Sequence, residues 1–580
     1  MDDALDMGNV HAVGGGGCTK GSARWTRAGP AQRAVPHPST GRTYLNHISV
    51  GSNSRYALSM PKRSSRRDAS VAAPSLGPDL PELQQARALW QLHRFDDSLA
   101  LFDRAVRKCP NNSLALVDAS RAFGSRFEIS RAEELLDRLI HLNGKSPDVL
   151  HLAGQSYRMI FRPDKAMDCF RRALATGQHL TDTRLELALL CERRHKLEEA
   201  LGFIEECLHR DPDYYAAELI KARLLRRMKG EESAESILRN LAEREAVHPQ
   251  IRAQAWAEIA QLLDRQAAFD EAMSAMLRCK ELLMSEEAPF RRESEVVLRH
   301  LGNLAQAVTK EHFRKWTDEA REFAPRKNAV LCSFPRSGTT LLEQVLDSHS
   351  GLVSSDEREA FARDIFPAMW QTRSTPVPEV TVLDSIPKER LSAQRERYFA
   401  YMSAALNEPI GSRVHLDKNP TLTLLLPAVL RLLPETRLLI ALRDPRDVVL
   451  SCFMQFLPLN PNSVCFLTLE RTARRYAFDM DVWRRLRDRV EASWLEVKYE
   501  QTVVNLEGEA RRALDFLGLP WEPQVLNYRE RLKQKAVASP TYEAVSKPLY
   551  TSSIGRWKHY EKYFAPLHEI LRENVDAFGY

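Results

Sequence analysis

NAVLCSFPRSGTT, residues 328–340, decides how the C-terminal half of this 580-residue chain is interpreted. Its first six residues, 328–333, form a short apolar run that predicts a buried β-strand. A hydroxyl-rich turn with one glycine follows, and the apolar residues of 341–346 then have helical spacing. A strand, a turn and a helix start predict an anion cradle, because the N–H groups and the dipole at a helix N-terminus attract negative charge.

Five residues of this turn are candidate ligands of the anion. Arg336 supplies a forked cation, Gly338 allows a close backbone approach, and three hydroxyl side chains add donors, Ser337, Thr339 and Thr340. The loop is not a Walker A motif, because no lysine follows the glycine and the first glycine of that motif is missing. The pattern therefore argues against a P-loop kinase or nucleoside triphosphatase, and another anion is expected.

A second strand with polar residues behind it follows about a hundred residues later. Residues 438–442 are apolar and predict a strand, Arg443 follows directly, and Ser451 lies eight residues further on. Two turns of helix return a hydroxyl toward the strand end, so a guanidinium and a hydroxyl can share one phosphate there. A third run, 497–500, ends in Tyr499 and a glutamate.

The order of these elements resembles the sulfotransferases, and the loop 334–340 looks most like that of the tyrosylprotein sulfotransferases. The resemblance covers about 327–580 and implies 3′-phosphoadenosine-5′-phosphosulfate as co-substrate, with its 5′-phosphosulfate on the loop. It implies that Arg443 and Ser451 hold the 3′-phosphate and that Tyr499 lies near the nucleotide. Two positions depart from the family pattern: the family has serine at Thr541 and lysine at Arg556.

The same resemblance suggests a catalytic pair. Glu357, which lies 21 residues after the loop arginine, is the candidate general base, with Asp356 and Glu359 as rivals. Lys418, in the run LDKNP, would lie beside the bridging oxygen and stabilise charge on the leaving phosphate, together with the loop arginine. The family carries an arginine where this chain has Glu359, which weakens the case for an acidic peptide acceptor. His349 is interpreted as structural.

The N-terminal half repeats with a fixed period. A small residue recurs every 34 residues at Ser98, Ala132, Ala166, Ala200 and Ala234, and Ala272 follows after a four-residue slip. A large apolar residue keeps the same phase four positions later, from Phe102 to Leu238. This resembles the tetratricopeptide repeat and predicts five or six helical hairpins in a solenoid. Its default role is to bind a peptide or protein partner, and a structural spacer is the alternative.

Charge and cysteine content restrict the remaining function classes. Residues 1–67 hold ten Lys/Arg and three Asp and therefore carry a net charge of +7. Because the whole chain has a net charge of +6, the remaining residues sum to −1. A nearly neutral folded part gives no support for a nucleic-acid partner. The nine cysteines contain no C-x-x-C pair, which favours reduced thiols in a cytoplasmic protein over disulfides or zinc. No apolar run is long enough to predict a membrane span.

These observations predict three parts: a disordered basic tail at 1–78, a tetratricopeptide solenoid at 79–310 and a sulfotransferase domain at 325–580. The fold class expected is α plus α/β, with a mostly parallel sheet whose site lies at the carboxyl ends of the strands. The expected activity is metal-independent transfer of a sulfuryl group to a hydroxyl acceptor. A protein tyrosine, a carbohydrate and a small molecule stay open as acceptors, and a non-catalytic repeat scaffold that binds nucleotide is the alternative.

Overall fold

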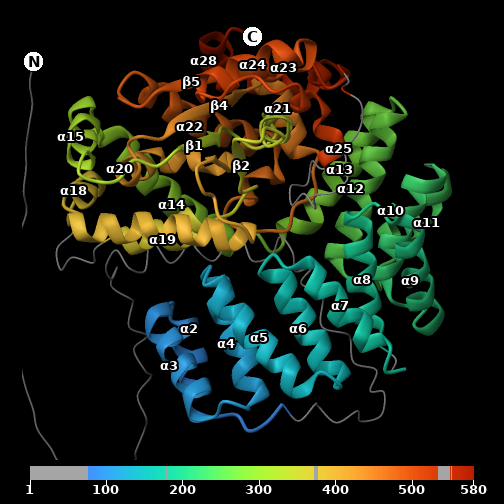
Figure 1. Ribbon diagram of the computed structural model, residues 1–580. Coiled ribbons are helices and arrows are strands. Elements are labelled where there is room, and N and C mark those ends of the chain that lie inside the picture. Colours follow the sequence, from blue (N-terminus) through green and yellow to red (C-terminus); the bar gives the residue numbers. More distant parts are fainter. Residues whose placement is uncertain (1–75, 178–179, 231, 371–376, 533–548, 550) are drawn as a thin grey trace, which may run out of the picture. The chain divides into compact units, whose positions relative to one another are not determined.

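The repeating small residues lie where two helices of a hairpin meet. The computed structural model describes residues 76–177, 180–230, 232–370, 377–532, 549 and 551–580. The predicted tail is therefore outside the described residues except for 76–78, and so is Thr541. Within these ranges the first half forms six helical hairpins, which follow one another from blue to green in Figure 1. Their helices are α2 (Pro81–Gln91), α3 (Phe95–Lys108), α4 (Ser113–Ser125), α5 (Ile129–Asn143), α6 (Pro147–Met159), α7 (Pro163–Leu174), α8 (Thr181–Arg193), α9 (Leu197–Arg210), α10 (Tyr215–Lys229), α11 (Glu232–Glu243), α12 (Pro249–Arg265) and α13 (Phe269–Met284).

Close packing inside each hairpin explains the 34-residue pattern. All six phase-setting residues, from Ser98 to Ala272, lie on the second helix of a hairpin and have no exposed surface. Gly154 shows why small residues are needed, since a Cβ at this position would lie 2.5 Å from the Phe170 ring. The predicted helical repeat is confirmed.

The turns of the hairpins share a backbone conformation that the sequence pattern did not indicate. The residue between the two helices has a positive φ in several hairpins, at His93 (57°), Phe127 (61°), Phe161 (62°) and His195 (57°). These four residues are also spaced by 34 positions. None of them is glycine, so the tight turn imposes a left-handed conformation on residues with bulky side chains.

The second half is built around a parallel sheet. Two helices, α14 (Ala288–Ala307) and α15 (Lys310–Ala320), precede it. The described residues form five strands in the order β2-β3-β1-β4-β5, and every neighbouring pair is parallel. The strands are β1 (Asn328–Cys332), β2 (Leu352–Ser354), β3 (Val414–Lys418), β4 (Arg437–Leu442) and β5 (Trp494–Lys498). The predicted α/β fold with a parallel sheet is confirmed.

Both faces of the sheet are covered, which explains its apolar strands. On one face, Ala329 and Leu331 of β1 pack with α16 (Thr339–Leu346) and α24 (Leu506–Phe516). Cys332 and the alternating residues of β4 face the other side. Helices that contribute to that second core are α19 (Lys388–Leu406), α20 (Leu426–Leu432), α21 (Pro445–Phe453), α22 (Leu469–Arg487) and α28 (His568–Phe578).

The strand order creates one place where loops from the whole sheet meet. The chain leaves β1 toward one edge, returns through β3, and then crosses to β4 on the other side of β1. A crevice opens at the carboxyl ends of the strands at such a switch point. The shorter elements of this half are η2 (Phe361–Ile365), α17 (Phe366–Met369), α18 (Glu379–Asp384), η3 (Pro420–Leu425), η4 (Val464–Leu467), α23 (Tyr499–Val504), η5 (Pro523–Asn527), α25 (Tyr528–Leu532), η6 (Arg556–Tyr560), α27 (Glu561–Phe564) and η7 (Ala565–Leu567).

None of the helices in the described ranges combines the length and the apolar character needed to cross a bilayer.

Candidate functional site

Each strand of the sheet ends at a residue that the sequence singled out. The loop with Arg336 follows β1, Glu357 follows β2, Lys418 is the last residue of β3, Arg443 follows β4 and Tyr499 follows β5. Parallel strands bring these five ends to one edge of the sheet. Residues that are far apart in sequence therefore surround one cavity of about 220 Å³, and four of these five residues line it.

The loop after β1 has the geometry of an anion cradle. Arg336 and Gly338 both have positive φ, 73° and 94°, and α16 begins directly after the glycine. A Cβ on Gly338 would lie 2.6 Å from Cδ2 of Tyr499, so only glycine fits between the loop and that ring. Thr339 and Thr340 at the start of α16 line the cavity, whereas Ser337 is buried and does not. A helix N-terminus with two hydroxyls thus faces the cavity.

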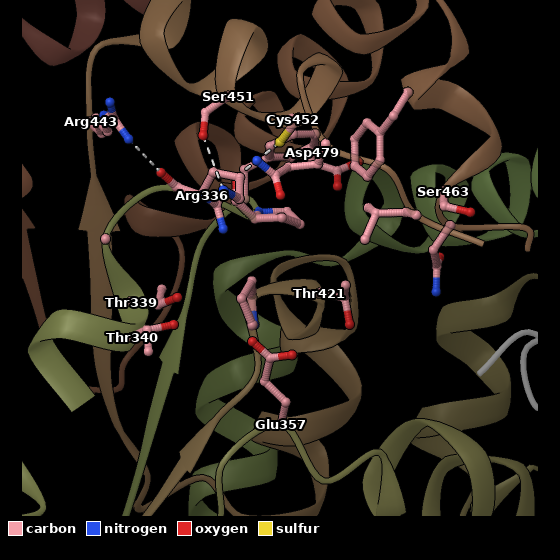
Figure 2. A pocket seen from close by; sticks show the side chains of 18 of the residues that line it. Arg336, Thr339, Thr340, Glu357, Thr421, Arg443, Ser451, Cys452, Ser463 and Asp479 are labelled. Atoms are coloured by element: carbon pink, nitrogen blue, oxygen red, sulfur yellow. Dashed lines mark hydrogen bonds between the residues drawn. The ribbon is translucent and has the colours of Figure 1, made fainter. Parts of the chain in front are cut away.

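Two arginines meet at this loop, Arg336 within it and Arg443 from the end of β4 (Figure 2). Arg336 donates from Nε to the Ser451 hydroxyl at 3.0 Å. Arg443 donates to the carbonyl oxygens of Arg336 (3.2 Å) and Ser553 (2.6 Å), and its guanidinium stacks on the Tyr499 ring at 4.8 Å. The structure therefore brings together the arginine, serine and tyrosine that were predicted to hold the nucleotide.

One donor in this cluster has nothing to bind. The Nε atom of Arg443 is buried and has no hydrogen-bond partner among the described residues. A buried donor of this kind costs free energy unless a ligand satisfies it. The arginine is therefore suited to hold an anion that reaches it through the cavity.

Glu357 faces the loop from the opposite side of the cavity (Figure 2). Asp356 is 3% exposed and does not line the cavity, and neither does Glu359. The cavity thus favours Glu357 over both rivals, because a general base must reach the acceptor hydroxyl. Glu357 and Asp356 both have positive φ, 51° and 41°, and the Glu357 amide donates to the Lys418 carbonyl at 2.7 Å. Two consecutive non-glycine residues in this conformation store backbone strain.

Lys418 lies behind Glu357 and does not line the cavity. Its side chain is fully buried, and the ammonium contacts three carboxylates, Glu357 at 2.9 Å, Asp356 at 2.9 Å and Glu343 at 3.2 Å. Burial alone would lower the pKa of Lys418, but the three carboxylates raise it well above the usual value. In this arrangement the ammonium holds the Glu357 carboxylate in place, and the predicted contact of Lys418 with a leaving oxygen stays a prediction.

The sequence analysis missed Glu343. It lies on α16 between apolar residues, 341–342 before it and 345–346 after Gln344, and it has no exposed surface. Its carboxylate also accepts a hydrogen bond from the Ser354 hydroxyl. A lone acidic residue among leucines was the signal that could have indicated a buried ionic partner.

Arg556 also lines the cavity, although its charge is engaged elsewhere. Its guanidinium pairs with Asp264 of α12 at 2.8 Å, and the same carboxylate accepts a hydrogen bond from Tyr560. His349 is buried and bonds to the Pro520 carbonyl at 2.7 Å, which agrees with a structural role.

The far end of the cavity is formed by residues that the sequence did not single out. The segment after α21 contributes Gln455, Pro458 and Ser463, and α22 contributes the buried ion pair of Arg475 and Asp479. The Nη1 atom of Arg475 has no hydrogen-bond partner among the described residues. This part of the cavity has both apolar and polar lining residues, as small-molecule and acceptor sites commonly do.

Asp417 is held by a hydrogen bond from Tyr398. The Tyr398 hydroxyl donates to Asp417 at 2.7 Å, and burial raises the pKa of Asp417 to about 7. Among the described residues no group of three or more His, Cys, Asp or Glu is arranged to hold a metal ion.

Asp417→Asn is expected to change the pH dependence of stability. Because the pKa of Asp417 is raised above its value of 3.8 in an unfolded chain, the native state holds the proton longer than the unfolded state. Its contribution to the free energy of unfolding therefore falls as pH rises from about 4 to about 7, by about 3–4 kcal/mol in all.

The Asn variant lacks this titration, so urea unfolding across this range should give a wild-type minus variant difference that falls with pH. Asp318→Asn, which alters an exposed carboxylate, is the control. A pH-independent difference for Asp417→Asn would contradict the prediction.

Comparison with known proteins relates part of this chain to a known family. Residues 329–523 match the model of the sulfotransferase family, so the C-terminal half contains a sulfotransferase-family domain. Protein-tyrosine sulfotransferase 2 of Gallus gallus is 25% identical over 236 residues, which cover 38% of this chain and 61% of the relative. Protein-tyrosine sulfotransferase 1 of Danio rerio is 24% identical over 237 residues, covering 38% and 63%.

Other similarities extend beyond this domain. An uncharacterized protein of Aquifex aeolicus is 25% identical over 343 residues, which cover 58% of this chain and 44% of that protein. The three relatives are thus matched over less than two thirds of their own length. Among solved structures, sulfotransferase STF9 from Mycobacterium avium is 15% identical with a TM-score of 0.27, covering 55% of this chain and 95% of that structure.

Proposed function

We propose that this protein transfers the sulfuryl group of 3′-phosphoadenosine-5′-phosphosulfate to a hydroxyl acceptor. The observation that carries the proposal is the pairing of an anion loop and a carboxylate across one cavity: Arg336 and the α16 N-terminus on one side, Glu357 on the other. The sulfotransferase-family domain supports a transferase, and the donor is inferred from that family.

The residues present fit this co-substrate. The α16 N-terminus with Thr339 and Thr340 would hold the 5′-phosphosulfate, and Gly338 leaves room for close approach of the backbone. Arg443 and Ser451 would hold the 3′-phosphate, for which the buried Nε of Arg443 is a ready donor. Two neighbouring arginines, Arg336 and Arg443, suit a nucleotide that carries phosphate groups at both the 3′ and the 5′ position of its ribose.

The chemistry needs one proton acceptor and stabilisation of charge. Glu357 accepts the proton of the acceptor hydroxyl while the acceptor oxygen forms its bond to sulfur. Arg336 and the loop amides stabilise the negative charge on the phosphate oxygen as its bond to sulfur breaks. By analogy with phosphoryl transfer, positioning and electrostatics are sufficient, and Lys418 contributes by keeping Glu357 oriented.

The leading acceptor is a protein tyrosine, which is what the names of the matched relatives describe for those proteins. Glu359 stands where an arginine would contact an acidic peptide, so a different peptide context, a carbohydrate or a small molecule are further acceptor classes to test. The hairpin repeat would bind a protein partner. The eight described cysteines are free, which supports a reducing, cytoplasmic location.

Calorimetric titration with 3′-phosphoadenosine-5′-phosphate tests the nucleotide site. The wild-type protein is expected to bind with micromolar affinity, about 8 kcal/mol. Arg443→Ala should weaken binding about 10- to 100-fold, because it removes hydrogen bonds to a charged group. The exposed Arg437, at the other end of β4, provides the control variant Arg437→Ala, which should bind like the wild type.

Absence of binding by the wild-type protein would refute the proposal and leave a repeat scaffold. Equal affinity of Arg443→Ala and wild type would refute the assignment of the 3′-phosphate site.

A further inference from the structure

The segment that carries Glu357 has an unusual backbone. After β2 the chain passes through two left-handed residues, Asp356 and Glu357, and then forms the short π-helix η2. Neither conformation is favourable by itself, so both persist only where surrounding contacts enforce them. The contacts on both sides of Glu357 therefore decide where its carboxylate lies.

One of these contacts comes from the third hairpin of the repeat. The guanidinium of Arg358, the residue after Glu357, lies 3.7 Å from the centroid of the Phe161 ring. Phe161 is the left-handed turn residue between α6 and α7. The Nε atom of Arg358 is buried and has no hydrogen-bond partner among the described residues. Stacking on the ring is therefore a main restraint on this side chain.

A second contact comes from the turn of the second hairpin. Arg126 forms an ion pair with Asp364 of η2, and both side chains are almost fully buried. Arg126 also donates to the Arg363 carbonyl at 2.8 Å, and Arg363 donates back to the Ser125 carbonyl at 3.3 Å. These bonds hold the π-helix against the end of α4 through both side-chain and backbone groups.

Two neighbouring hairpin turns thus hold the residues before and within η2, on the C-terminal side of Glu357. The N-terminal side is held by the sheet itself, through the bond from the Glu357 amide to the Lys418 carbonyl. Helix α19 also contacts this segment, since Arg397 pairs with Asp364 at 3.3 Å and the Tyr398 ring packs against Phe361. The hairpin turns supply the contacts to Arg358 and to the Arg363 carbonyl. A displacement of about 1 Å at a catalytic group lowers turnover by up to about 100-fold.

We propose that the second and third hairpins are part of the catalytic unit, because Phe161 and Arg126 position the segment that carries Glu357. This rests on the function proposed above. Phe161 is a positioning residue that acts through Arg358. The repeat then has a role in catalysis in addition to the binding of a partner. Binding of a partner to the repeat and the placement of Glu357 are then physically connected.

Three substitutions at Phe161 test the proposal in the 580-residue chain. Phe161→Ala removes the ring, Phe161→Leu keeps apolar bulk without an aromatic face, and Phe161→Tyr restores the face. The matched control is His195→Ala, which alters the same turn position one hairpin later, where the side chain contacts Arg227 of the following repeat. Hydrogen exchange of the peptide 355–365, nucleotide affinity, kcat and KM are measured for each variant.

Phe161→Ala and Phe161→Leu are expected to lower kcat about 10- to 100-fold. Hydrogen exchange at 355–365 should be faster, and affinity for 3′-phosphoadenosine-5′-phosphate should change less than about twofold, because the anion loop is untouched. Phe161→Tyr and His195→Ala should resemble the wild type. Unchanged exchange at 355–365 and unchanged kcat in Phe161→Leu would overturn the proposal.

The two hypotheses fail in different ways. If the wild-type protein binds no nucleotide, the proposed function is wrong, yet faster exchange at 355–365 in Phe161→Leu would still establish that the hairpins restrain this segment. If nucleotide binding is intact but kcat and exchange do not respond to Phe161, the sulfotransferase assignment stands and the positioning role is wrong.

Discussion

Glu357→Gln is expected to lower kcat by about 100- to 10,000-fold, the usual contribution of a general base. Glutamine is isosteric and keeps an oxygen that can accept the hydrogen bond from Lys418 at 2.9 Å, so the segment should stay in place. It cannot accept a proton from the acceptor hydroxyl. Initial rates with a co-substrate labelled in its sulfuryl group measure kcat, and calorimetry with 3′-phosphoadenosine-5′-phosphate measures nucleotide affinity. The affinity is expected to be unchanged.

The neighbouring carboxylate provides the matched control. Asp356→Asn alters a residue that also contacts Lys418 at 2.9 Å but is 3% exposed and lies outside the cavity. Its effect on kcat should stay below about tenfold, with a larger effect on unfolding than Glu357→Gln has. The opposite order, with Asp356→Asn inactive and Glu357→Gln active, would assign the base to Asp356.

The fold could be predicted from sequence because it depends on local rules. The 34-residue recurrence from Ser98 to Ala234 reflects a need for small side chains in every hairpin, and all of these side chains are buried. The anion loop could also be predicted from sequence, because the strand, the glycine and the helix start that form it are neighbours in the chain. Placing the ends of parallel strands at one edge then follows from topology.

The partners inside the site could not be predicted in the same way. Lys418 was expected in the cavity, but a buried strand residue can face any of several carboxylates, and spacing does not tell which one it meets. The contact of Arg358 with Phe161 joins segments from different halves of the chain and depends on how the hairpins meet the sheet. Such long-range contacts carry no periodic signal.

Lys418→Met is expected to be the most destabilising single change in the site. It would leave Glu343, Asp356 and Glu357 together in the interior without a cation, whereas the wild-type ammonium contacts all three. Removing one partner of a buried ionic cluster costs about 3–5 kcal/mol of unfolding free energy. Turnover should also fall, because Glu357 loses the group that holds it.

The pH dependence of the free energy of unfolding distinguishes the loss of the buried cation in Lys418→Met from a simple packing defect. The pKa of Lys418 lies well above 10.5, so in the wild type the ammonium stays charged between about pH 5 and pH 8 and contributes equally across that range. In the variant, the clustered carboxylates bind protons more tightly when folded than when unfolded. Stability of Lys418→Met should therefore rise relative to wild type as pH falls, as urea unfolding at both pH values would show.

A double substitution separates the structural effect from the catalytic one. Glu343 has no exposed surface and lies away from the cavity, and glutamine there would keep the acceptor for the Ser354 hydroxyl. Lys418→Met combined with Glu343→Gln removes one of the uncompensated charges, so it should regain part of the lost stability at about pH 8 but little of the lost kcat. Full recovery of both would mean that Lys418 serves only to neutralise Glu343. A single Lys418→Met variant as stable as wild type at both pH values would show that the ionic cluster does not form in solution.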